Sequence, residues 1–113
     1  MEIQQSQVDG SDVFTIIGDI DGNTAPTAQE KILPLASADA SIALDMSGVA
    51  YMSSAGLRML LVLYRNIMGQ GGKVVLVGLS EELQDTMTLT GFMDFFEHYD
   101  TIDEGLAALG QAG

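Results

Sequence analysis

The chain has 113 residues, a length that suits one domain with its own core, and 47% of them are hydrophobic. It has no cysteine, which excludes disulfides and thiolate metal sites, and its net charge of −12 argues against nucleic acid or an anionic membrane as a partner. The sequence contains neither a signal-peptide pattern nor an apolar run long enough to span a membrane. We therefore expect a soluble, cytoplasmic protein with a single domain over residues 1–113.

The first third of the chain predicts a β-hairpin followed by a helix. Residues 2–8 form a polar strand suited to the edge of a sheet, and a turn over residues 10–12 leads into a strong strand at residues 13–17. A helix should begin about two residues before Pro26, because proline is tolerated in a first turn, and Pro34 should kink or stop it. The core-facing side chains of this helix should be Ile32, Leu33 and Leu35.

Strands and helices alternate through the middle of the chain. Residues 41–46 predict a third strand, and residues 73–77 predict a fourth that is apolar throughout and therefore buried on both faces. A long helix that ends at Gly69 lies between them. Its apolar residues recur every three or four positions, which predicts an inward stripe. The members of this stripe are Leu57, Leu60, Leu61, Tyr64, Ile67 and Met68.

The last third predicts two more helices around a short strand. Ser80 should cap a third helix that ends at Gly91, and residues 95–99 favour a strand. Thr101 and Glu104 form a capping-box pattern for a final helix containing Leu106 and Leu109. The expected fold class is α/β: an N-terminal β-hairpin, then alternating helices and strands that form a mixed sheet with helices packed against it.

Two adjacent serines, Ser53 and Ser54, stand where the third strand gives way to the long helix. A hydroxyl at such a junction caps the helix by accepting from its unpaired N–H groups. One cap needs only one hydroxyl, so the second could point outward, where the helix dipole would stabilise a phosphate. The pair is therefore either two capping residues, or a cap at Ser53 beside a phosphorylation site at Ser54.

Three stretches of the chain resemble the bacterial anti-sigma-factor antagonists, which are STAS domains. Residues 45–57 (DMSGVAYMSSAGL) are similar to the central motif of that family, residues 18–21 (GDID) to the end of its second strand, and residues 71–77 to the strand after its long helix. The resemblance covers nearly the whole chain. Two positions depart from the family pattern, because Ser53 stands where many members carry Asp and Ala55 where many carry a second hydroxyl.

The resemblance implies a phosphorylation-switched binding protein with no catalytic residue, metal or cofactor of its own. It implies that Ser54 is the phosphorylated serine, that Ser53 is a neutral cap beside it, and that Asp21 belongs to the partner surface. The implied partners are an anti-sigma factor that is a serine kinase, bound by the unphosphorylated form so that a sigma factor is released, and a metal-dependent, PP2C-like serine phosphatase. We expect a monomer.

The outward half of the long helix carries further candidates for partner contact. Arg58 and Val62 lie on it, and Val62 stands between two arginines. Met59 and Leu63 lie on the same half, where they are either exposed or covered by a neighbouring helix.

Two other functions remain open from the sequence. The chain could be a STAS-type subunit of another complex, such as a lipid-transport or sensor assembly, in which the serine is never phosphorylated. It could also be a small serine hydrolase, since residues 52–56 are half of a nucleophile elbow. That elbow pattern requires glycine where Met52 stands, and the single histidine, His98, falls in a predicted strand.

Overall fold

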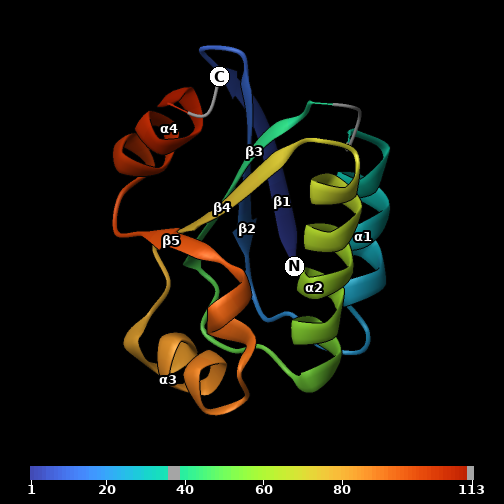
Figure 1. Ribbon diagram of the computed structural model, residues 1–113. Helices are drawn as coiled ribbons and strands as arrows, with labels where there is room; N and C mark the ends of the chain where they lie inside the picture. The colour runs from blue at the N-terminus through green and yellow to red at the C-terminus, as the bar shows by residue number, and fades with distance from the viewer. Residues whose placement is uncertain (36–38, 112–113) are drawn as a thin grey trace.

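The computed structural model describes residues 1–35 and 39–111 (Figure 1). Five strands and four helices alternate as the sequence predicts, with short 3₁₀ helices at Leu33–Leu35 and Phe92–Phe95. The elements are β1 (Glu2–Val8), β2 (Ser11–Ile17), α1 (Ala25–Ile32), β3 (Ser41–Gly48), α2 (Ser54–Gly69), β4 (Lys73–Val77), α3 (Glu81–Leu89), β5 (Glu97–Tyr99) and α4 (Ile102–Gln111). None of the helices in the described ranges is long and apolar enough to cross a membrane.

One mixed sheet with the strand order β1-β2-β3-β4-β5 organises the fold. β1 pairs with β2 in the antiparallel sense, and the three later pairings are parallel. The hairpin turn lies at Asp9 and Gly10, both with positive φ, so β2 begins at Ser11 and not after it as the sequence suggested. An Asp-Gly pair suits the tight hairpin turn that needs two such residues. The α/β fold class is confirmed.

The two faces of the sheet are covered by different helices (Figure 1). Successive side chains of a strand point to opposite faces of the sheet, so neighbouring residues belong to different hydrophobic cores. The larger core joins one face to α1, α2 and α3 and contains Phe14, Ile16, Ile42, Leu44, Met46, Val74 and Leu76 from the strands. The smaller core lies under α4 and contains Val13, Ala43, Val75 and Val77. As predicted, β4 is buried on both faces.

Most predicted helix boundaries are confirmed by their caps. The Ser80 hydroxyl accepts from the N–H of Leu83 at 3.1 Å and begins α3, and the Thr101 hydroxyl accepts from the N–H of Glu104 at 3.2 Å and begins α4. Helix α1 ends at Ile32, two residues before Pro34, as expected of a proline that stops a helix. The expectation that Leu35 faces the core lies outside the side chains that the structure describes.

The buried stripe of α2 contains Leu57, Leu60 and Ile67 as predicted, but it extends further around one side of the helix and omits one predicted member. Met59 and Leu63 are buried, whereas Met68, assigned to the stripe, has 43% of its surface exposed. Helix α1 packs against α2, and its buried residues belong to the same core cluster as Met59 and Leu63, so of the two alternatives left open for these residues the structure shows the buried one. Hydrophobic spacing marks an apolar face, but the neighbouring helix decides how far that face extends around the axis.

The aromatic segment before β5 also differs from prediction. Phe95 was expected to begin a strand, but it ends a 3₁₀ helix, and β5 covers only Glu97–Tyr99. The Tyr64 ring of α2 packs edge-on against Phe96, with ring centres 5.1 Å apart, and lies 6.4 Å from the ring of Phe95. This tertiary packing outweighs the strand preference of the aromatic residues.

Helix α4 rests close to the sheet because Gly105 has no side chain. A Cβ added there would lie 2.7 Å from Cγ2 of Val77. We predict that Gly105→Ala lowers the free energy of unfolding, since an overpacking cost of about 1–3 kcal/mol exceeds the roughly 0.5–1 kcal/mol that alanine gains over glycine in a helix. Gly110→Ala, in the same helix, meets no atom within 4 Å and should be neutral or slightly stabilising in urea unfolding. Equal effects of the two changes would contradict this packing.

Candidate functional site

The segment before α2 is attached to the loop after β2 by a short parallel bridge between Ile20 and Met52. The N–H of Ile20 donates to the carbonyl of Tyr51 at 3.0 Å, and the N–H of Ser53 donates to the carbonyl of Ile20 at 2.9 Å. Both bridging side chains are buried. The two loops therefore share one fixed backbone geometry where α2 begins.

Gly56 allows the first turn of α2 to approach this bridge. A Cβ at residue 56 would lie 2.7 Å from the carbonyl oxygen of Ile20. Any side chain would therefore push the helix away from the loop. The glycine of the central motif is thus required by a close backbone contact.

The two serines occupy different positions at this helix end. Ser53 is the N-cap, with an extended backbone, and its hydroxyl accepts from the N–H of Gly56 at 3.3 Å. Ser54 is the first residue of the helix and is exposed. The backbone of α2 is therefore capped without any contribution from the Ser54 hydroxyl. Because the side chain is exposed, a kinase active site could reach that hydroxyl.

Asp21 organises the loop between the bridge and α1. Its Oδ1 accepts from the N–H groups of Asn23 at 2.9 Å and Thr24 at 3.1 Å, and from the Thr24 hydroxyl at 3.3 Å. The hydrogen bond from Asn23 makes the largest contribution to lowering the pKa of the Asp21 carboxyl below its ordinary value, and the bond from Thr24 adds to it. Asp21 is half-buried, so this carboxylate shapes the loop next to the site.

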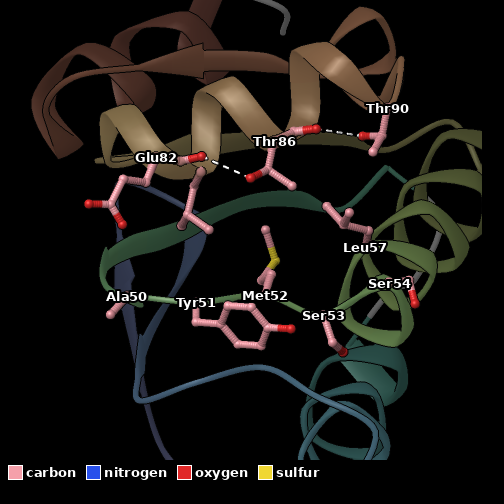
Figure 2. A pocket seen from close by; sticks show the side chains of 10 residues that line it. Ala50, Tyr51, Met52, Ser53, Ser54, Leu57, Glu82, Thr86 and Thr90 are labelled. Carbon is pink, nitrogen blue, oxygen red and sulfur yellow. Dashed lines mark hydrogen bonds between the residues drawn. The ribbon is translucent and has the colours of Figure 1, made fainter.

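One groove, of about 340 Å³, lies between the segment before α2 and the helix α3 (Figure 2). Tyr51 is 55% exposed on the lower wall, and Glu82 carries the one carboxylate among the lining residues. The hydroxyls of Thr86 and Thr90 on the opposite wall donate to carbonyls of α3 itself, as the dashed lines in Figure 2 show. The lining residues are Ala50, Tyr51, Met52, Ser53, Ser54, Leu57, Glu82, Leu83, Thr86 and Thr90.

A second groove, of about 250 Å³, lies between α1 and α2. It brings together Arg58 and Val62, both exposed, over the buried side chain of Met59. Arg58 makes no ion pair with any residue in the ranges 1–35 and 39–111. The ion pair present in these ranges joins Lys73 to Glu97 at 3.5 Å. The lining residues are Gly22, Ala25, Pro26, Gln29, Ala55, Arg58, Met59 and Val62.

The structure thus places the sequence-derived candidates around one helix end. Arg58 and Val62 share a groove with Gly22, which directly follows Asp21, while Ser53 and Ser54 line the other groove. Sequence reasoning missed the wall supplied by α3, with Glu82, Thr86 and Thr90. Nothing in the local sequence indicated that α3 would lie opposite the serines, although Thr86 and Thr90, four residues apart, share one face of it.

The geometry gives no support to a hydrolase. His98 lies on β5 and is not among the residues that line the groove beside Ser54. In the described part of the chain, no group of three or more His, Cys, Asp and Glu side chains could hold a metal ion. No hydrogen bond joins the Ser54 hydroxyl to a histidine or carboxylate of the described residues, and such a pair is what activates the nucleophile of an acyl-transfer mechanism.

Comparison with known proteins places the chain in a family. Residues 2–105 match the STAS domain model. The chain is 35% identical, over 82 residues, to an anti-sigma-B factor antagonist of Bacillus subtilis, covering 73% of this chain and 75% of that protein. Together the fold and the domain match define a STAS domain. The chain belongs to the STAS-domain family of anti-sigma-factor antagonists.

Solved structures share the fold over nearly all of the chain. An anti-sigma factor antagonist from Mycobacterium paratuberculosis superposes with a TM-score of 0.85 at 27% identity, covering 96% of this chain and 93% of that one. The Bacillus cell fate determinant SpoIIAA in its phosphorylated form superposes with a TM-score of 0.71 at 17% identity, covering 95% and 98%. At that identity the SpoIIAA likeness concerns the fold alone.

The division of roles between the serines predicts different effects on stability. Ser53→Ala should lower the free energy of unfolding by about 1 kcal/mol, because the N-cap hydrogen bond is lost. Ser54→Ala should change it by less than about 0.5 kcal/mol, because an exposed side chain without a capping bond is removed. Chemical denaturation of the two variants measures the difference, and a larger loss for Ser54→Ala would mean that the cap has been assigned to the wrong serine.

The Asp21 loop predicts a dependence on pH. Since the folded-state pKa of Asp21 is lowered, its stabilising contribution is complete above the ordinary pKa and disappears as the pH falls through the lowered value. Asp21→Ala should therefore be less stable than the wild type at pH 7, and the difference should shrink in acid. The exposed neighbour Asp19 supplies the control variant, Asp19→Ala. A difference for Asp21→Ala that stays constant with pH would show that its charge is not responsible.

Proposed function

We propose that the chain is a monomeric anti-sigma-factor antagonist that acts in the cytoplasm by binding and not by catalysis. In its unphosphorylated form it binds an anti-sigma factor that is also a serine kinase, and a sigma factor is thereby released. Phosphorylation of Ser54 by that kinase ends the binding, and a metal-dependent, PP2C-like serine phosphatase restores it. The observation that carries the proposal is an exposed hydroxyl at the first position of α2, beside a neighbour that already provides the cap.

The site can accept a phosphate without refolding. A phosphate on Ser54 would lie at the N-terminus of α2, where the helix dipole and the free N–H groups of the first turn favour a negative charge by roughly 0.3–1 kcal/mol. The cap at Ser53 and the bridge at Ile20 involve other atoms and would remain. SpoIIAA, which shares this fold, has a structure in a phosphorylated form, and this supports a fold that is compatible with a phosphate on the chain.

Release would arise at the interface. A phosphoserine brings about −1.5 to −2 charges and three strong acceptor oxygens. Ser54 lines one groove and its neighbour Ala55 lines the other, so the phosphate would add bulk and charge beside the surface that contains Arg58 and Val62. A partner fitted to the neutral hydroxyl would have to desolvate this charge, so its affinity falls while the antagonist stays folded.

Phosphate incorporation tests this proposal directly. After incubation with ATP and an extract of the native host, the wild type should carry one phosphate at Ser54, and Ser54→Ala should carry none while still capturing the kinase. Ser53→Ala serves as the matched control and should remain a substrate. Phosphate on the Ser54→Ala protein would place the acceptor elsewhere.

The same experiment separates the alternatives. Stable capture of a partner without any phosphate on the wild type would favour a STAS-type subunit of another complex. Covalent labelling of Ser54 by a fluorophosphonate would favour a hydrolase.

A further inference from the structure

We propose that phosphorylated Ser54 is held by Arg58 of the same helix, and that this ion pair draws Arg58 out of the groove between α1 and α2. The inference rests on the proposed phosphorylation of Ser54 and adds a mechanism by which one phosphate would alter the partner surface at two points. Ser54 and Arg58 are both exposed and lie four residues apart on α2.

Helix geometry brings the two side chains together. Residues at positions i and i+4 lie on one face of a helix, with Cβ atoms about 5–6 Å apart. Long side chains on a helix lean toward its N-terminus, so Arg58 extends over the turn that contains Ser54. The neighbouring lining residue is Ala55, whose single methyl group leaves this path open.

The beginning of α2 is held in place, which keeps this spacing fixed. Ser53 caps the first turn, and Gly56 sits so close to the Ile20 carbonyl that the turn has no room to move inward. A phosphate on Ser54 therefore stays within reach of the Arg58 guanidinium. Arginine forms paired hydrogen bonds with phosphate oxygens, which fits it to this role better than lysine.

The distribution of charge favours the same pair. The chain carries −12 net charge, and Glu82 is the one carboxylate that lines the same groove as Ser54, so these negative charges repel a phosphate there. Arg58 makes no ion pair with a described residue, so no carboxylate there has to be displaced. The next cation along α2 is Arg65, eleven residues from Ser54 and therefore about 16 Å away along the axis.

The groove between α1 and α2 changes as a consequence. In the unphosphorylated protein Arg58 lines this groove beside Val62 and Met59 and offers a cation to a partner. Pairing with the phosphate neutralises that cation and moves it toward the helix end. Phosphorylation thus adds negative charge at Ser54 and removes positive charge from the groove in a single step.

The test uses the full chain with phosphoserine encoded at position 54, which does not depend on any kinase. Titration of its ³¹P signal should give a phosphate pKa a few tenths of a pH unit lower than in the Arg58→Ala variant, because a cation favours the dianion. Arg65→Ala removes the same charge from the same helix beyond reach of the phosphate and should match the wild type. Equal phosphate pKa values in all three proteins would overturn the proposal.

A second readout follows the arginine itself. In ¹⁵N spectra the side-chain Nε–H signal of Arg58 should shift on phosphorylation, while that of Arg65 should not. An unchanged Arg58 signal would likewise overturn the proposed ion pair between Arg58 and the phosphate. Both measurements leave the proposed function untouched, because the kinase assay above decides independently whether Ser54 is the acceptor.

Discussion

The parallel bridge between Ile20 and Met52 is the contact on which the candidate site depends. It connects the loop after β2 to the segment after β3, two parts of the chain that are joined here by backbone hydrogen bonds. Because Ser53 donates its N–H to the carbonyl of Ile20 and its hydroxyl caps α2, the direction of the helix is set at its N-cap. Gly56 then permits the close approach of the helix to the Ile20 carbonyl, and Ser54 is left outside this network.

Helix α2 is therefore fixed on one side and accessible to a partner on the other. The inner face of α2 is fixed by the sheet and α1, while its outer face and first turn border two grooves. A modification on the outer face or first turn changes the surface that a partner contacts, while the buried contacts of the inner face stay the same. A phosphate at such a place would act on a partner through its charge and bulk and would not require a second backbone conformation.

The exposed part of α2 also differs from the rest of the chain in its charge. The chain has 16 acidic and 4 basic residues, and two of the basic ones, Arg58 and Arg65, lie on the exposed part of α2. A local cation in so acidic a protein marks a surface that differs from its surroundings, and it is also the group that a phosphate would affect most strongly. The position of Arg58, one turn from Ser54, connects these two properties.

The sequence by itself determined the features that depend on neighbouring residues: the hairpin, the apolar β4, the caps at Ser53, Ser80 and Thr101, and the family motif. These follow from turn chemistry, capping and periodicity, which act over a few residues. Only the tertiary structure decided that Met59 is buried while Met68 is exposed, and that α3 lines the same groove as Ser54. The same holds for the close contact at Gly56. These features depend on contacts between segments that are distant in the chain, and the local sequence does not indicate which segments will pack together.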